Sequence, residues 1–238
     1  MHSHVAAWIR RAGVLTIAIG AAGALISGVT HAQVPGEPGA EAKRINDATL
    51  VLANLTSATG NPIPGAMLQA AEAIVVFPYA EQGTRARGQG PNQVRGNATM
   101  GIRARGILSV RGDAGTWSPP AFVTLNGGGR HLGDLVFVIP NRKGVDQLLG
   151  PQFALDADGA SAVGPLAATV APDVTVLIYS QPRDWAAKTT FKGVMLSRDP
   201  TSNQNFYGKA LNSREAIAQA DGPEPVAAWR AALKRHVR

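Results

Sequence analysis

The chain contains no cysteine, which excludes disulfide scaffolds, thiol nucleophiles and cysteine metal sites. Charged residues make up 16% of it, against a usual fraction of about 25%, and aromatic residues only 5%. After the N-terminal region no apolar stretch approaches the roughly 20 residues of a membrane-spanning helix, which excludes a polytopic membrane protein. The 238 residues are 45% hydrophobic and carry a net charge of +7. This composition predicts one sizeable globular domain with a basic surface.

The start of the chain has the three-part pattern of a secretory signal peptide. Two arginines at 10–11 precede an apolar and small-residue run at 12–29, and Thr-His-Ala at 30–32 supplies the small residues that precede a cleavage site. The alternative is an uncleaved membrane anchor. We expect residues 1–32 to be removed, a flexible lead-in rich in Pro and Gly at 33–40, and export to the periplasm, the cell envelope or the exterior.

Hydrophobic periodicity and breaker residues predict a chain of mixed helices and strands. Two helices at 41–59 and 64–72 come first, and the strand at 73–77 that follows is expected to end at Pro78. Further elements are expected as strands at 102–111, 121–126, 135–139, 152–156, 174–181 and 189–198, and as helices at 142–149, 203–211, 213–219 and 225–237.

The same pattern predicts the topology of the domain. The run at 135–139 is apolar at every position, which indicates a central strand covered on both faces. Asn141 is placed to cap the helix that follows it. The strands at 174–181 and 189–198 form a candidate hairpin. We predict an α+β fold in one domain, with an antiparallel-rich β-sheet or partly closed barrel, N-terminal helices and a C-terminal helix.

Short segments that are collinear from about residue 41 to residue 209 form a recognisable pattern. They are I-P and L within 63–68, A-I-V-V-F-P at 73–78, G-I-L-S-V-R at 106–111, G-T-W-S-P-P-A-F at 115–122, D-L-V-F-V at 134–138, A-V-G-P at 162–165, I-Y-S at 178–180, F-K-G-V at 191–194 and F-Y-G-K at 206–209. In this order they resemble the SYLF lipid-binding domain family, with this chain as a bacterial secreted member. The resemblance gives a SYLF-like domain at 41–211 and leaves 212–238 as a C-terminal helical extension.

The resemblance also implies a function. Members of the family bind anionic lipids, which are phosphoinositides in eukaryotes, and some fungal members are linked to actin. An exported bacterial-type protein does not meet actin, so the resemblance implies lipid binding here. The chain departs from the pattern at 83–104, which is longer and richer in arginine than usual, and at 127–134 and 195–199, which are shorter.

Arginines gather between residues 82 and 112, where the chain has no Asp or Glu. Because side chains alternate along a strand, three arginines of the strand at 102–111 share one face. Guanidinium groups suit phosphate, and a Gly-rich backbone allows a headgroup to approach closely. The alternative is a solvated outer face of the sheet, with acids supplied by other segments. The candidate headgroup ligands are Arg103, Arg105 and Arg111 on the strand, assisted by Arg85, Arg87 and Arg95 upstream.

The C-terminal segment is typical of an amphipathic helix with basic flanks. Apolar residues recur there at spacings of three and four around Trp229, and Arg230, Lys234 and Arg235 lie beside them. Trp between apolar and cationic residues is typical of a helix that lies in a membrane interface. We therefore add these four residues to the lipid-binding candidates, with Trp229 leading insertion. The alternative is a helix that docks onto the domain, its cations favoured by the helix dipole.

Other ligands and chemistries find little support in the sequence. The arginine-rich stretch has no aromatic residue to stack on bases, which argues against nucleic acid. A Ser-His-Asp site would need His131 with Asp134 and either Ser109 or Ser118, and no nucleophile elbow is present. The D-A-D-G sequence at 156–159 opens like a calcium loop but lacks its later acids. We expect no enzyme activity, no cofactor and no metal ion.

The remaining aromatic residues lie in or beside the expected strands. We expect them to build the core, as Trp117, Phe122, Phe137, Phe153, Tyr179 and Phe191. The sequence thus predicts an exported, non-enzymatic protein that binds an anionic phospholipid or another anionic envelope lipid through peripheral membrane contact. The alternative function is an envelope scaffold or interaction module that binds a protein or glycan partner.

Overall fold

The fold is described from a computed structural model of the chain. Residues 38–238 form one compact unit. The predicted signal peptide at 1–32 lies outside the described residues. The described residues are 39–57, 63–85, 99–128, 133–155, 161–163, 174–181, 191, 193–220 and 222–235, with side chains described in these ranges except at 81–85, 99–101, 128 and 161–163.

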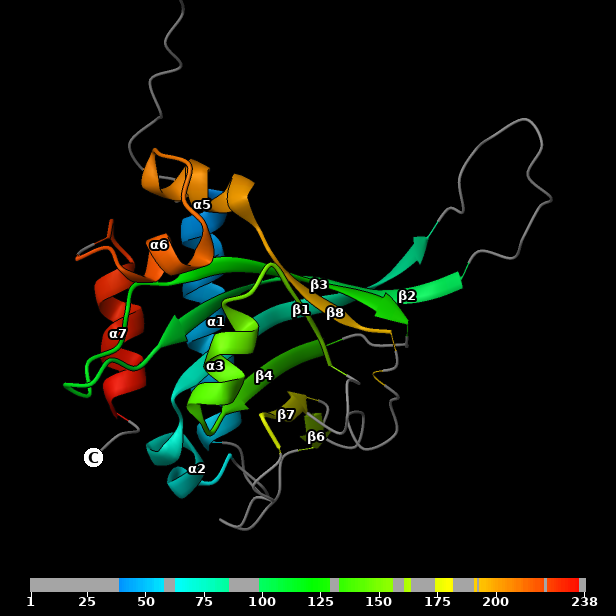
Figure 1. Ribbon diagram of the computed structural model, residues 1–238, viewed down its shortest axis with the longest axis horizontal. Helices are drawn as coiled ribbons and strands as arrows, with labels where there is room; N and C mark the ends of the chain where they lie inside the picture. The colour runs from blue at the N-terminus through cyan, green and yellow to red at the C-terminus, as the bar shows by residue number, and fades with distance from the viewer. Residues whose placement is uncertain are drawn as a thin grey trace, which may run out of the picture. The chain divides into compact units, whose positions relative to one another are not determined.

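One eight-stranded sheet is the centre of this unit, with strand order β5-β8-β3-β2-β1-β4-β7-β6 (Figure 1). Every neighbouring pair is antiparallel except β6 and β7. This confirms the prediction of an α+β fold with an antiparallel-rich sheet. The strands are β1 (Ala73–Arg85), β2 (Thr99–Val110), β3 (Ala121–Gly128), β4 (Gly133–Ile139), β5 (Gln152–Ala154), β6 (Ser161–Val163), β7 (Val176–Gln181) and β8 (Met195–Arg198).

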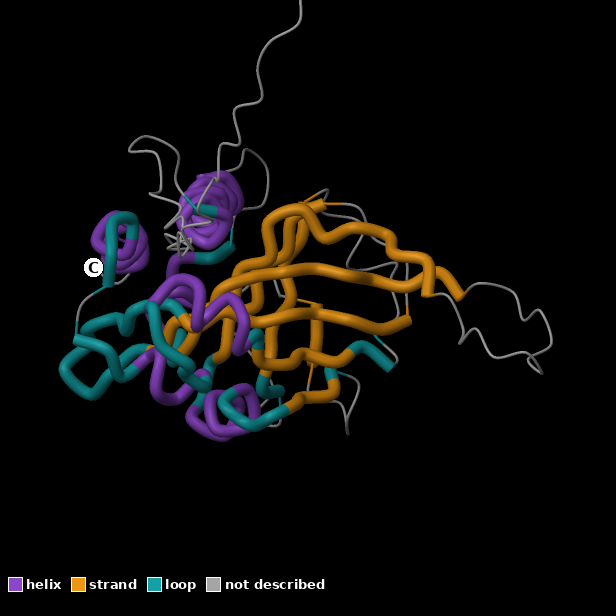
Figure 2. Tube along the Cα trace, turned by 90° about the horizontal axis from the view of Figure 1, so that it is seen from above, coloured by secondary structure: helices purple, strands orange, loops and turns teal. Residues whose placement is uncertain are grey.

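The helices gather over one end of the sheet, and strands continue beyond them (Figure 2). Among the described residues no helix combines the length and the apolar character needed to cross a bilayer. The helices are α1 (Ala40–Ser57), α2 (Gly65–Ala70), α3 (Arg142–Leu148), α5 (Pro200–Tyr207), α6 (Ser213–Ile217) and α7 (Val226–Arg235).

Local sequence signals explain where these helices form. The apolar spacing of three and four along α1 becomes a buried stripe that includes Ile45, Leu52 and Leu55. The side chain of Asn141 accepts a hydrogen bond from the backbone N–H of Gly144 at 2.9 Å, which confirms the predicted cap of α3. Asp199 caps α5 in the same way.

Side-chain alternation divides the core into two layers, one on each face of the sheet. On one face, α1, α2 and α7 cover strand residues such as Ile107 and Phe122. We call this the α1 face. On the other face, α3 covers residues such as Leu108 and Phe137. Five of the six aromatic residues expected in the core are buried, and the sixth, Phe191, is partly buried on the face that α3 covers. The five are Trp117, Phe122, Phe137, Phe153 and Tyr179.

The prediction that Pro78 ends the first strand is wrong, because β1 continues to Arg85. The register with β2 shifts between Val76 and Glu81. Pro78 lies in this irregular segment, where no hydrogen bond to the neighbouring strand is required of its backbone nitrogen. This irregularity also places Tyr79 at a φ of 53°.

The predicted hairpin between 174–181 and 189–198 is also wrong. β7 pairs with β4 and β6, whereas β8 pairs with β3 and β5. The two strands therefore lie near opposite edges of the sheet. Alternating apolar residues specify that a strand forms and which face it buries, but they do not specify its partner.

Candidate functional site

The α1 face of β2 changes character along the strand. Alternation places Arg103 and Arg105 on the same face as Ile107 and Ser109. Ile107 and Ser109 are fully buried, whereas both arginines are exposed. The arginine side chains therefore reach solvent where the helical cover of the sheet ends.

The exposed arginines border a hollow of about 320 Å³ between α1 and the strands β1 and β2. Lys43 enters this hollow from α1, and Pro78 and Tyr79 enter from the irregularity of β1. We call Lys43, Tyr79, Arg103 and Arg105 the arginine patch. Three of its four members are cations contributed by two separate elements.

Two nearby acids, Asp47 and Asp199, lie against Lys43 of the patch and against the buried Arg44. The ammonium of Lys43 pairs with Asp47 at 2.6 Å, and this hydrogen bond raises the pKa of Lys43. Arg44 is buried and lies 3.7 Å from the carboxylate of Asp199. Burial lowers the pKa of Arg44, and Asp199 opposes that shift.

Neither arginine of the patch has a carboxylate partner among the described side chains. The register sets Glu81 of β1 opposite Arg103. On β3 it sets Thr124 opposite Arg105 and Asn126 opposite Arg103. In the described register, a glutamate therefore lies opposite Arg103 but none lies opposite Arg105. The side chain of Arg105 is exposed to solvent.

Tyr79 is a member of the patch that the sequence did not point to. Its side chain is 72% exposed, and its backbone has a φ of 53°, which costs a non-glycine residue roughly 1–2 kcal/mol. The backbone N–H of Tyr79 donates to the carboxylate of Asp134 at 3.1 Å, which holds this conformation. Leu50, 63% exposed, lies on the same side of α1 as Lys43 by helical spacing. The patch therefore combines cations with the exposed ring of Tyr79.

The other arginines expected upstream do not add to this geometry. Arg85 ends β1 opposite Thr99, and its side chain is not among those described. Arg87 and Arg95 lie outside the described residues. Their role as assisting ligands stays a prediction.

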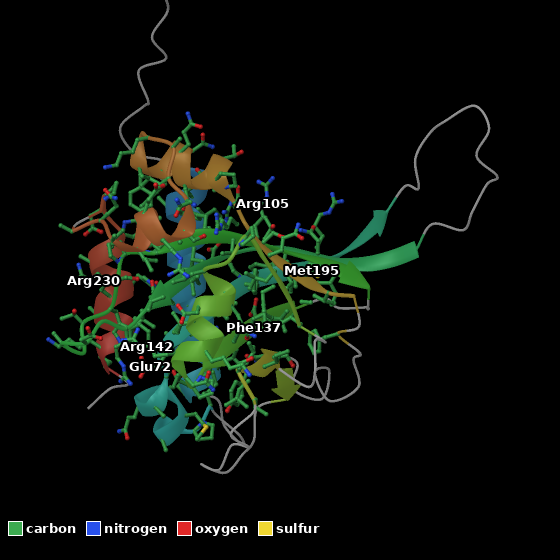
Figure 3. All side chains as sticks on the ribbon, in the orientation of Figure 1. Glu72, Arg105, Phe137, Arg142, Met195 and Arg230 are labelled. Atoms are coloured by element: carbon green, nitrogen blue, oxygen red, sulfur yellow. The ribbon has the colours of Figure 1, made fainter. Side chains whose placement is uncertain are left out.

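Arg111 directly follows the last residue of β2, six residues along the chain from Arg105. It is half-buried, and its Nη1 donates to the carbonyl oxygen of Gln69 at 2.7 Å. Its guanidinium carbon is 6.0 Å from the ring centroid of Trp117. The prediction that Arg111 joins Arg103 and Arg105 in one cluster is therefore not matched. Figure 3 shows Arg105 apart from Arg142 and Arg230, which lie together on the side of the helices α3 and α7.

Trp229 is completely buried, and its indole N–H donates to the hydroxyl of Ser109 at 2.8 Å. This corrects the prediction that Trp229 leads insertion into a membrane, because the apolar stripe of α7 packs against α1 and the sheet. Arg230 is half-buried and donates to the carbonyl oxygen of Ala220 at 3.4 Å. Lys234 and Arg235 are exposed in the last turn of α7.

The residues considered for catalysis have structural partners or lie outside the described residues. Ser109 accepts from Trp229, and the hydroxyl of Ser118 donates to the carbonyl oxygen of Pro119. Asp134 accepts from the backbone of Tyr79. His131 and the calcium-like sequence at 156–159 lie outside the described residues. Within the part of the chain that the structure describes, no three His, Asp or Glu side chains are grouped as metal ligands.

A comparison with protein-family models gives a match. Residues 127–236, a little less than half of the chain, match the family model described as "Ysc84: Las17-binding protein actin regulator". No curated protein and no solved structure matches the chain. The matched segment runs from the end of β3 through α7, so it includes the helices that the sequence analysis set apart as an extension. The arginine patch lies before it in the chain.

The match confirms the resemblance seen in the sequence. Ysc84 and SYLF domains are one lipid-binding and actin-regulating family. Over residues 127–236 this chain is similar to the Ysc84 (SYLF) family.

Proposed function

We propose that this protein binds the headgroups of anionic lipids through the arginine patch. The observation that carries the proposal is the pair of exposed arginines, Arg103 and Arg105, beside the exposed ring of Tyr79. Lipid binding is a property of the family that the chain matches, and the anionic headgroup is the finer assignment added here.

The chemistry of the patch suits a phosphate at a membrane surface. Guanidinium groups donate paired hydrogen bonds to phosphate oxygens. A basic residue near an anionic surface contributes on the order of 1 kcal/mol, so two or three of them give weak attachment that salt weakens further. The exposed side chain of Tyr79 adds the apolar contact that stable peripheral binding needs.

The proposal includes export and the absence of enzymatic activity. The signal-like segment at 1–32 supports export, and it predicts a mature protein that begins at Gln33. The intact mass of the protein recovered from the culture medium or the periplasm tests this directly. A mass that retains the first 32 residues contradicts cleavage at this position.

Vesicle flotation tests the proposed ligand. We expect the mature chain to float with vesicles that contain an anionic phospholipid and not with zwitterionic vesicles, and to be released as salt is raised. Arg103→Glu with Arg105→Glu reverses two charges of the patch and is expected to abolish flotation. The matched control is Lys143→Glu with Lys209→Glu, which makes the same change in net charge at two exposed residues elsewhere.

Three outcomes are informative. Loss of flotation by the patch variant alone supports the proposal. Equal loss in both variants indicates a response to overall net charge and contradicts the assignment of this face. Binding that is indifferent to lipid charge favours the alternative of an envelope scaffold that binds a protein or glycan partner.

A further inference from the structure

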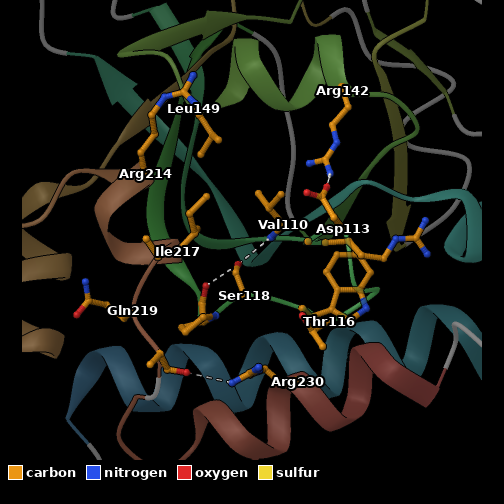
Figure 4. A pocket seen from close by; sticks show the side chains of 16 residues that line it. Val110, Asp113, Thr116, Ser118, Arg142, Leu149, Arg214, Ile217, Gln219 and Arg230 are labelled. Carbon is orange, nitrogen blue, oxygen red and sulfur yellow. Dashed lines mark hydrogen bonds and ion pairs between the residues drawn. The ribbon is translucent and has the colours of Figure 1, made fainter.

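A second basic site lies at the opposite end of β2 from the arginine patch. It is a pocket of about 530 Å³ between the β2–β3 connection and the helices α3, α6 and α7 (Figure 4). Four arginines from four separate segments line it: Arg111, Arg142, Arg214 and Arg230. Among its lining residues only Asp113 is acidic.

Two of the four arginines are balanced by carboxylates. Arg142 donates to Asp113 at 2.8 Å and lies 3.3 Å from the carboxylate of Glu72. Arg214 lies 3.7 Å from Asp146. These contacts are solvent-exposed ion pairs that shape the rim of the pocket and contribute little free energy.

The other two arginines have only neutral partners among the described residues. Arg111 donates to the carbonyl oxygen of Gln69 and lies over the ring of Trp117. Arg230 donates to the carbonyl oxygen of Ala220. A carbonyl positions a guanidinium without neutralising it, and each guanidinium has further N–H donors. Within the described part of the chain, therefore, no carboxylate pairs with Arg111 or Arg230 at the pocket.

The pocket wall also contains an aromatic ring. Trp117 lines the pocket and is 3% exposed. Because solvent does not reach its indole Nε1, Trp117 contributes an apolar surface to the wall and not a hydrogen-bond donor. The volume lies within the range of small-ligand sites.

We propose that this pocket binds a small phosphate ester, with Arg111 and Arg230 as ligands of the phosphate. The site is separate from the arginine patch and does not depend on its role at a membrane. The phosphate ester is either a free small molecule or the headgroup of a lipid, because both present the same oxygens to the guanidinium groups.

Titration calorimetry of the mature chain with glycerol 3-phosphate tests the site, with glycerol as the uncharged control. Arg230→Gln keeps a hydrogen-bonding side chain and removes the charge, and it is expected to raise the dissociation constant about tenfold. Arg230→Lys should recover part of the affinity. The matched control is Arg105→Gln, the same change in the arginine patch, which should leave glycerol 3-phosphate binding unchanged while it weakens flotation with anionic vesicles.

A second pair of variants tests the pocket without changing an arginine. Ala218→Glu places a carboxylate at the pocket lining, and it is expected to abolish glycerol 3-phosphate binding, whereas Ala228→Glu on the exposed side of α7 should not. If Arg230→Gln also weakens flotation, the ligand is a lipid headgroup. If flotation is unaffected, the ligand is a free ester. Absence of glycerol 3-phosphate binding, or equal binding by the native chain, Arg230→Gln and Ala218→Glu, overturns the proposal.

Discussion

The two ends of β2 differ in what covers the α1 face of the strand. Toward its C-terminal end, Ile107 and Ser109 are fully buried, and Ser109 accepts the indole hydrogen bond of Trp229. On the same face a few residues earlier, Arg103 and Arg105 are exposed. The C-terminal part of β2 around Ile107 and Ser109, which we call the covered end, therefore belongs to the hydrophobic core. The part around Arg103 and Arg105, which we call the open end, belongs to a cationic surface.

The difference follows from the direction of the helices. β2 has 12 residues, which extend over roughly 40 Å. α1 contacts β1, β2, β4 and β7, so it crosses the strands and covers only part of the length of β2 (Figure 1). Basic residues on a strand thus become available to a ligand only where this cover stops. The covered end is expected to determine stability, and the open end to determine binding.

The largest expected difference between the two ends is in their contribution to stability, and removing the side chain that covers one end tests it. Trp229→Ala deletes a fully buried indole and its hydrogen bond to Ser109, and it is expected to lower the free energy of unfolding by about 3–5 kcal/mol. Arg105→Ala at the open end should change it by no more than about 0.5 kcal/mol. Urea unfolding followed by circular dichroism measures both. Similar losses in the two variants would show that the open end is packed as well.

Gly106 lies between the two ends of β2. A Cβ at this position would overlap the carbonyl oxygen of Val76 and the ring of Phe77. Gly106→Ala is therefore expected to destabilise the fold by about 1–3 kcal/mol. The control is Gly65→Ala, where a Cβ meets no atom within 4 Å. Thermal melts of the two variants measure the difference, and equal melting temperatures would mean that β1 and β2 are less closely packed here than the structure has them.

Tyrosine ionisation probes the covered side of the sheet. Burial raises the pKa of Tyr179 to about 12, and burial also raises the pKa of Tyr207, whose hydroxyl donates to the carbonyl oxygen of Pro120 at 2.6 Å. The folded state then holds these protons more tightly than the unfolded state, whose tyrosine pKa is about 10. Stability is expected to be complete below about pH 10 and to fall as the pH rises toward 12. Tyr207→Phe should reduce this fall in alkaline urea titrations, and an unchanged fall would contradict the role of Tyr207.

The smallest expected effect concerns the contact that positions Tyr79 at the open end. Asp134→Ala removes the acceptor that holds the backbone N–H of Tyr79. We expect a loss of about 1 kcal/mol or less in stability and a few-fold loss in vesicle affinity, because Tyr79 no longer stays beside the arginines. Vesicle co-sedimentation measures the second effect. Full affinity in Asp134→Ala together with full affinity in Tyr79→Ala would remove the tyrosine from the site.

Elements of the fold that depend on neighbouring residues could be predicted from the sequence. The buried stripe of α1, the cap at Asn141 and the central position of β4 all follow from local spacing and side-chain chemistry. The pairing of β7 and β8 could not, because strand partners are selected by contacts between residues far apart in the chain. The passage of β1 through Pro78 depends on a register shift that only the assembled sheet defines.

The candidate site divides in the same way. Alternation alone identified Arg103 and Arg105, because a strand fixes which side chains share a face. It did not separate them from Arg111, whose partner Gln69 belongs to α2. The amphipathic spacing around Trp229 fits a membrane interface and a protein core equally well, and only the distant partner Ser109 distinguishes the two. Tyr79 was missed because its exposure arises from the irregularity in β1.

The central claim is that the open end of β2 faces the membrane while the covered end does not. The chain contains no cysteine, so one cysteine can be introduced and labelled with an environment-sensitive fluorophore without interference. Asn126→Cys places the label at an exposed residue opposite Arg103, and Ala228→Cys places it on the exposed side of α7. With anionic vesicles we predict a blue shift and quenching by lipid-borne quenchers at position 126 only. A response at position 228 with none at 126 would contradict the account.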